Sequence, residues 1–87
     1  MKPEATIEIY YKTWCSYSRA ALALLDDLGV AYTGIDVTSD PEREAEMVRR
    51  SGRTTVPEIF IHNEVIGGYD DLRAFVDLGA LDSRMAA

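Results

Sequence analysis

The sequence predicts a single α/β domain over residues 1–87, in which a four-stranded mixed sheet carries helices on both faces. Three observations lead to this prediction. The chain has 87 residues, too few to give each of two domains a sufficient interior. Short segments with the alternating apolar pattern of strands are separated by segments whose apolar residues recur at helical spacing. Apolar residues make up 47% and charged residues 28% of the chain, which are ordinary values for a folded domain.

The N-terminal part predicts a strand, a helix and a second strand. Residues 7–11 (IEIYY) alternate in polarity and are rich in β-branched and aromatic residues, so we expect a strand there. From Tyr17 to Leu28 apolar residues follow helical spacing on a core-facing side, and Gly29 is expected to end this helix. Residues 31–37 (AYTGIDV) indicate the second strand, which lies parallel to the first because a helix connects the two.

The middle of the chain predicts a second helix and a hairpin. Ser39 or Asp40 is expected to cap a helix that Gly52 ends, since both side chains accept from the free N–H groups of a first turn. Residues 58–61 and 64–66 are typical of two short strands. The His-Asn dipeptide between them favours a tight turn, because Asn tolerates a positive φ angle. We therefore expect an antiparallel hairpin.

A last helix completes the predicted order. Asp70 is expected to cap it, Leu72 and Phe75 lie on its apolar face, and Gly79 ends it. The elements then follow the order β-α-β-α-β-β-α, with a four-stranded mixed sheet and helices on both faces. This is the order of the thioredoxin fold.

Charge and composition exclude several classes of function. There are 9 basic and 15 acidic residues, a net charge of −6, so nucleic acid is not an expected partner. No apolar run reaches the roughly 20 residues that span a bilayer, and residues 1–6 lack the apolar core of a signal peptide. We expect no membrane partner and a cytoplasmic location. A single cysteine also excludes a secreted domain held by internal disulfides.

The position of Cys15 indicates a reactive thiol. It lies between the first predicted strand and the first helix, where unpaired N–H groups favour a thiolate and Lys12 adds positive charge. The alternative is a cysteine that only fills the core, but the polar neighbours Thr13, Ser16 and Ser18 argue against it. Ser18 stands three residues after Cys15, where a redox pair would hold its second thiol. An alcohol cannot resolve a mixed disulfide, although it can donate a hydrogen bond to the thiolate.

Four segments together resemble the glutaredoxin family. In chain order they are Lys12, Trp14-Cys15-Ser16-Tyr17-Ser18, Thr55-Val56-Pro57 and Gly67-Gly68-Tyr69-Asp70-Asp71. Their order and spacing match the family across about residues 7–81. The resemblance implies a cis peptide bond before Pro57, facing the active cysteine. It also implies a glutathione-dependent thiol–disulfide oxidoreductase, with glutathione as co-substrate and no metal.

The same resemblance, together with the residue types, predicts a glutathione site. Its expected residues are Lys12, Cys15, Tyr17, Thr55, Val56, Pro57, Gly68, Tyr69, Asp70 and Asp71. The backbone of Thr55 and Val56 would pair with the cysteinyl unit as an added strand. The N–H groups of Tyr69 and Asp70 would receive the γ-glutamyl carboxylate, with Asp70 or Asp71 opposite its ammonium group. Lys12 is the candidate for the glycyl carboxylate, and Arg53 has low weight for that role.

These residues predict reduction of protein–glutathione mixed disulfides by a monothiol mechanism through Cys15. The expected partners are glutathione and glutathionylated proteins or small disulfides, and the chain is expected to act as a monomer. Ser18 is either natural or the replacement of a resolving cysteine. One alternative is a [2Fe–2S] carrier in which Cys15 of two chains and two glutathiones hold the cluster; Trp14 and the Cys-Ser-Tyr-Ser sequence differ from the Cys-Gly-Phe-Ser usual in such carriers. Another is a redox-inert adaptor.

Overall fold

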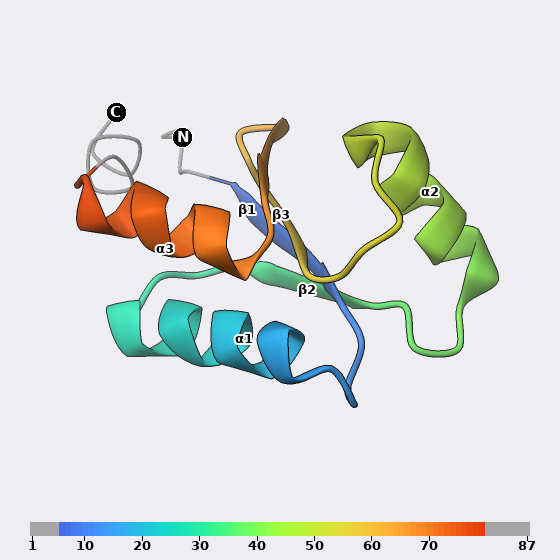
Figure 1. Cartoon of the computed structure of the whole chain (residues 1–87), viewed down its shortest axis with the longest axis horizontal. Coiled ribbons are helices and arrows are strands. Elements are labelled where there is room, and N and C mark those ends of the chain that lie inside the picture. The colour runs from blue at the N-terminus through green and yellow to red at the C-terminus, as the bar shows by residue number, and fades with distance from the viewer. Residues whose placement is uncertain (1–5, 80–87) are drawn as a thin grey trace.

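The computed structural model describes residues 6–79, which form one mixed sheet and three helices (Figure 1). In chain order the elements are β1 (Ile7–Tyr11), α1 (Ser16–Leu28), β2 (Thr33–Asp36), α2 (Pro41–Ser51), β3 (Glu58–Ile61), β4 (Glu64–Gly67) and α3 (Tyr69–Asp77). The predicted β-α-β-α-β-β-α order and the predicted fold class are confirmed. Within this part of the chain no helix is long and apolar enough to cross a membrane.

The strands lie in the order β2-β1-β3-β4. β1 pairs in parallel with β2 and antiparallel with β3, and β3 pairs antiparallel with β4. The hairpin turn between β3 and β4 is formed by His62 and Asn63, which have φ angles of 54° and 67°. The predicted hairpin is therefore confirmed, and both of its turn residues adopt the left-handed conformation.

The two central strands are buried on both faces, because one face is covered by α1 and α3 and the other by α2 (Figure 1). The core on the first face consists of Ile7, Ile9, Ala21, Leu25, Ile59, Ile61 and Leu72. The core on the second face consists of Tyr10, Val37, Met47 and Phe60. Because successive side chains of a strand point to opposite faces of the sheet, β1 and β3 each contribute residues to both cores.

Several boundaries differ from the sequence-based expectation, namely both ends of β2, the end of β4 and both caps of α3. β2 begins at Thr33 instead of residue 31, and its pairing with β1 begins at Glu8 and Thr33. α3 begins at Tyr69 and has Gly68 as its N-cap, so the expectation that Asp70 caps this helix is wrong. The Asp71 carboxylate, one turn into the helix, accepts the N–H of Gly68 at 3.1 Å. The side chain of Asp71 therefore satisfies the N–H of the N-cap residue Gly68.

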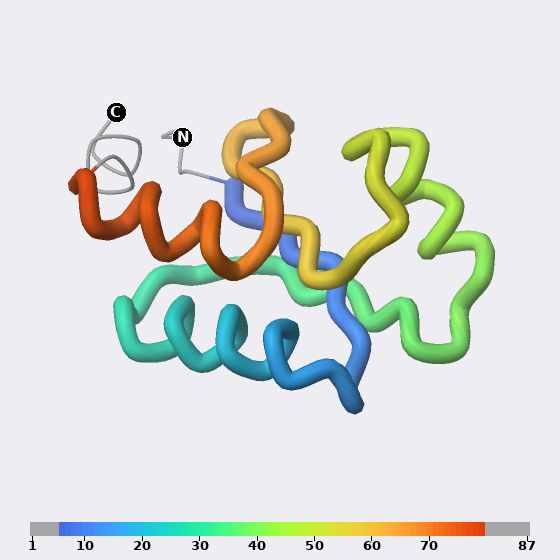
Figure 2. The backbone as a smooth tube through the Cα atoms, in the orientation of Figure 1, coloured from blue at the N-terminus to red at the C-terminus, as the bar shows by residue number. Residues whose placement is uncertain are grey.

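The remaining helix ends agree with the predicted signals. Asp40 caps α2 by accepting the N–H of Arg43 at 3.1 Å, and Gly29 and Gly52 end α1 and α2 in the left-handed conformation. From the end of α2 the chain returns along the yellow segment of Figure 2 to the start of β3, close to the start of α3. This return brings together the segments that form the site.

Candidate active site

Cys15 is the N-cap residue of α1 and lies in a braced loop. The guanidinium of Arg19 donates to the carbonyl of Thr13 at 3.2 Å, and the N–H of Thr13 donates to the Thr38 hydroxyl at 2.9 Å. The Cys15 thiol is partly exposed, and its Sγ lies 3.8 Å from the carbonyl oxygen of Val56. The loop therefore holds the sulfur in an accessible position beside the segment that precedes β3.

The surroundings of Cys15 favour its thiolate. Partial burial opposes ionisation, but the backbone N–H and the hydroxyl of Ser18, the N–H of Tyr17 and the charge of Arg19 outweigh it, so the pKa of Cys15 is lowered. The first turn of α1 contains no acidic residue that would oppose a negative charge there. A lowered pKa means more thiolate at neutral pH, and the thiolate is the nucleophile.

Ser18 is fully buried, whereas Tyr17 is 61% exposed. The expectation that the core face of this helix begins at Tyr17 is therefore wrong. Residues 18, 21 and 25 face the sheet, and this spacing turns Tyr17 away from the core. The Ser18 Oγ accepts the N–H of Lys12 at 3.2 Å, which leaves its own proton free to be donated toward the Cys15 sulfur.

Lys12 contacts both α2 and the loop that carries Cys15. Its Nζ forms an ion pair with Glu44 at 3.2 Å and lies 5.6 Å from the centre of the Trp14 ring, which is itself 66% exposed. The positive charge that favours the Cys15 thiolate comes from Arg19. Lys12 therefore braces the loop against α2, and its role toward a glycyl carboxylate stays a prediction.

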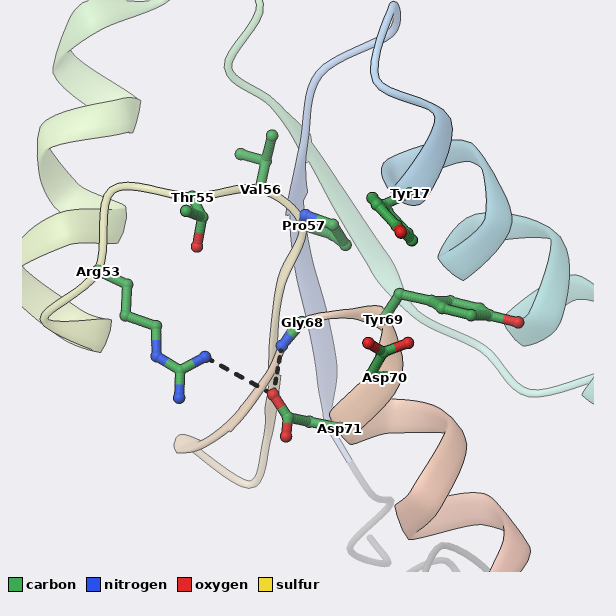
Figure 3. A pocket seen from close by; sticks show the side chains of 9 residues that line it. All are labelled: Tyr17, Arg53, Thr55, Val56, Pro57, Gly68, Tyr69, Asp70 and Asp71. Atoms are coloured by element: carbon green, nitrogen blue, oxygen red, sulfur yellow. Dashed lines mark hydrogen bonds and ion pairs between the residues drawn. The ribbon is translucent and has the colours of Figure 1, made fainter.

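A groove of about 260 Å³ runs beside this loop (Figure 3). Its lining residues are Tyr17, Arg53, Thr55, Val56, Pro57, Gly68, Tyr69, Asp70 and Asp71. Eight of the ten residues predicted for a glutathione site line the groove, while Lys12 and Cys15 do not. The Val56–Pro57 peptide bond is cis, as expected. Of the other motif residues, Ser16 is exposed on the first turn of α1.

One wall of the groove is aromatic. The rings of Tyr17 and Tyr69 lie with their centres 6.3 Å apart and their planes inclined by 34°. Tyr17 comes from the first turn of α1 and Tyr69 from the first residue of α3, so the two helix starts meet at this wall (Figure 3). The exposed faces of the rings offer apolar surface to a ligand in the groove.

The other end of the groove carries opposite charges. Arg53 reaches from the segment between α2 and β3 toward Asp71, and its guanidinium lies 3.6 Å from that carboxylate (Figure 3). Among the lining residues Arg53 is the only cation. Sequence reasoning gave it little weight because it is one of four arginines within eleven residues. Its position two residues before Thr55 was the available signal, and both residues line the groove.

Glu58 is a feature of the site that sequence reasoning missed. It is fully buried at the start of β3, and its Oε2 accepts the Thr55 hydroxyl at 3.1 Å. Its Oε1 has no hydrogen-bond partner among the described residues. Burial raises the pKa of Glu58, as does the charge of Asp71, against the opposing effects of Thr55 and Arg53. The sequence did contain a signal for it, because Glu58 is the one charged residue in the otherwise apolar strand β3.

The fold and the site define a class: a thioredoxin-like α/β domain with a thiol at the N-terminus of its first helix and a cis-proline segment beside it. The glutaredoxin family model matches residues 7–66, so the chain belongs to the glutaredoxin family. It is 46% identical over 78 residues to glutaredoxin 3 of Escherichia coli K12, covering 90% of this chain and 94% of that protein. It is 41% identical over 81 residues to a glutaredoxin of Pseudomonas aeruginosa, covering 93% and 96%.

Solved structures agree with this assignment. The solution structure of a Brucella melitensis glutaredoxin has a TM-score of 0.80 and 44% identity, covering 94% of this chain and 89% of that one. A buckwheat glutaredoxin–glutathione complex has a TM-score of 0.82 and 28% identity, covering 92% and 76%. The family supports a role as an oxidoreductase in glutathione-linked redox chemistry.

Proposed function

We propose that this protein reduces protein–glutathione mixed disulfides by a monothiol mechanism through Cys15. The observation that carries the proposal is an accessible thiol of lowered pKa at the start of α1, 3.8 Å from the carbonyl of Val56 beside the groove. The groove offers what glutathione requires: an extended backbone edge, helix N–H groups and charged side chains. Its substrates are glutathionylated proteins or small disulfides, and it acts as a monomer in the cytoplasm.

The groove accommodates each part of glutathione in this proposal. The Thr55–Val56 backbone pairs with the cysteinyl unit, which directs its sulfur toward Cys15. The N–H groups of Tyr69 and Asp70 receive the γ-glutamyl carboxylate at the N-terminus of α3. Arg53 is better placed than Lys12 to take the glycyl carboxylate, because Arg53 lines the groove and Lys12 does not.

The reaction consists of two thiol–disulfide exchanges. The Cys15 thiolate attacks the glutathionyl sulfur of the mixed disulfide, the old S–S bond breaks, and the substrate leaves as a thiolate that takes a proton from water. The thiolate of a second glutathione then attacks the Cys15–glutathione disulfide. Oxidised glutathione leaves and the Cys15 thiolate is restored. Ser18 cannot attack the adduct, because an alcohol does not replace a thiolate in this exchange.

Intact-protein mass spectrometry tests the proposal. The reduced chain is mixed with oxidised glutathione and then with excess reduced glutathione, and Cys15→Ser is treated in parallel. We expect one glutathione to attach to the unchanged protein and then to leave, and none to attach to the variant. If no adduct forms and the protein instead purifies anaerobically as a brown dimer, the monothiol proposal is wrong and the [2Fe–2S] alternative is supported.

A further inference from the structure

Glu58 is a buried titratable group that the two exchanges do not use. It lies opposite Tyr10 of β1 in the sheet, on the face that α2 covers. The groups that face it are Thr55 and Arg53 from the preceding segment and Asp71 from α3. The Tyr10 hydroxyl is occupied, because it donates to Glu46 and accepts from Arg50. Glu58 therefore has one neutral hydrogen-bond donor, Thr55, and no ion pair of its own among the described residues.

Hydrogen-bond accounting favours the uncharged form of this carboxyl. An ionised Glu58 would be a buried anion with a single neutral donor on Oε2 and nothing on Oε1. The nearest cation, Arg53, is paired with Asp71 at 3.6 Å and is half exposed. A buried charge without a partner costs far more than a buried hydroxyl without one. The neutral acid keeps a carbonyl oxygen for the Thr55 hydroxyl.

We propose that Glu58 is a positioning residue of the glutathione groove: as an uncharged carboxyl it fixes Thr55, and its ionisation weakens the binding of the glutathione anion. This inference rests on the proposed function, because Thr55 supplies the backbone edge for the cysteinyl unit. The mechanism needs no proton from Glu58. The residue acts through Thr55 and through the charge of the groove.

The charge balance of the groove explains the second part of the proposal. The lining residues include Asp70 and Asp71 against the single cation Arg53. Glutathione brings two carboxylates and one ammonium group, so its net charge near neutral pH is negative. A further buried negative charge at Glu58 repels this ligand and competes with it for Arg53, and low-dielectric surroundings strengthen both effects.

Ligand binding across pH tests the proposal, with S-methylglutathione as a probe that cannot form a disulfide. The Kd is measured by titration calorimetry from about pH 5 to about pH 9 for the unchanged protein and for Glu58→Gln, whose amide has the shape of the neutral acid. We expect the Kd values of the two proteins to converge as the pH falls toward the acid end. At the alkaline end the unchanged protein should bind roughly threefold to tenfold more weakly than the variant. Cys15 titrates in both proteins, so its effect cancels in the ratio.

Two further proteins complete the test. Glu42→Gln removes an exposed carboxylate on α2, and its Kd should follow that of the unchanged protein at every pH. Thr55→Val keeps the backbone but removes the donor to Glu58, so it should weaken binding severalfold already at the acid end. A Glu58→Gln ratio that does not vary with pH, or a Thr55→Val protein that binds normally, overturns the positioning role.

Unfolding measurements separate this inference from the proposed function. The pKa of Glu58 is raised in the folded state, so the folded protein holds this proton more tightly than the unfolded chain. The contribution of Glu58 to stability is therefore complete below its ordinary pKa and is lost as the pH rises above it. Glu58→Gln should gain stability relative to the unchanged protein over that window. If this gain appears but no protein binds the probe at any pH, the carboxyl is uncharged as inferred, while the proposed function and the positioning role both fail.

Discussion

At the scale of single residues, the reactivity of Cys15 depends on Ser18. Ser18 is fully buried, and its hydroxyl accepts the N–H of Lys12. Because that contact fixes the oxygen, the hydroxyl proton is available to stabilise a negative sulfur. The N–H groups at the start of α1 act in the same direction. Ser18 stands where a redox pair would hold its second thiol, and it also helps to keep the Cys15 thiol ionised.

Replacing this hydroxyl should raise the thiol pKa. In Ser18→Ala the pKa of Cys15 should rise, because the thiolate loses one hydrogen-bond donor. Only the thiolate of Cys15 reacts quickly with iodoacetamide. Because the pKa of Cys15 is lowered in the unchanged protein, alkylation slows only when the pH falls through this lowered pKa. In the variant, alkylation should begin to slow at a higher pH. Ser16→Ala, at an exposed position, is the matched control. Identical midpoints for Ser18→Ala and the unchanged protein would contradict the role of the hydroxyl.

Individual site residues were predictable where local position decides their chemistry. Cys15 was assigned because it stands at a strand-to-helix junction, and the cis bond before Pro57 followed from family resemblance. The positions of Lys12 and Arg53 could not be predicted from the sequence, because both depend on α2. The ion pair with Glu44 holds Lys12, and the return segment from α2 presents Arg53 to the groove. Such tertiary contacts leave no periodic signal in the sequence.

At the scale of elements, the junction between β4 and α3 depends on the close approach of the Asp71 carboxylate to Gly67. Gly67 has a φ angle of 122°, and a Cβ placed on it would lie 2.2 Å from Oδ2 of Asp71. That carboxylate accepts the N–H of Gly68 and pairs with Arg53. The glycine therefore allows Asp71 to cap α3 from inside the helix, and it also explains why Asp70 is not needed as the cap.

A double-mutant cycle tests this junction. Gly67→Ala should lower the free energy of unfolding by about 2 kcal/mol or more, since it combines backbone strain with a steric clash. Asp71→Ala alone should cost about 1 kcal/mol through the lost cap. The double variant should be less destabilised than the sum of the two, because removing the carboxylate also removes the clash. Urea denaturation provides all three values, and strict additivity would show that Gly67 and Asp71 are not coupled.

Another element-scale contact attaches α2 to the sheet. The Arg50 guanidinium lies 4.1 Å from the centre of the Phe60 ring, donates to the Tyr10 hydroxyl at 2.8 Å and pairs with Glu8 at 2.8 Å. Arg50→Ala should destabilise the fold by about 2 kcal/mol, because it removes packing and leaves part-buried acceptors unpaired. Arg49→Ala, at the exposed neighbouring position, should stay within about 0.5 kcal/mol. Equal losses for the two variants in urea denaturation would refute a special contribution of Arg50.

Most elements were predictable because their signals are local. Strand alternation, the Asp40 cap and the glycines that end α1 and α2 appear in the structure as expected. The errors fall where tertiary structure decides. β2 is shorter than expected and forms four pairs with β1, and Tyr17 is exposed because the orientation of α1 on the sheet buries Ser18 instead. A single sequence does not reveal how many residues of two strands pair, nor how a helix is rotated about its axis on the sheet.

At the scale of the whole molecule, the proposed function predicts that charge distinguishes one substrate from another. The chain has a net charge of −6, whereas the groove itself carries one cation and two carboxylates. Glutathione is common to every glutathionylated protein, so contacts in the groove do not discriminate among them. In the proposed reaction, the protein part of the substrate would lie outside the groove and experience the field of the whole chain. That field attracts basic segments and repels acidic ones.

Glutathionylated peptides should therefore react at rates that depend on their flanking charge. Two peptides of equal length, one with lysines and one with glutamates beside the modified cysteine, are compared by kcat/KM for deglutathionylation. At low ionic strength the basic peptide should react roughly threefold to tenfold faster, because a negative surface raises its rate of encounter. The difference should nearly vanish at about 0.5 M salt, where screening reduces the reach of surface charges to a few ångströms. A preference that persists at high salt would indicate direct contacts near Cys15 instead of long-range attraction, and equal rates at low salt would show that the net charge does not select substrates.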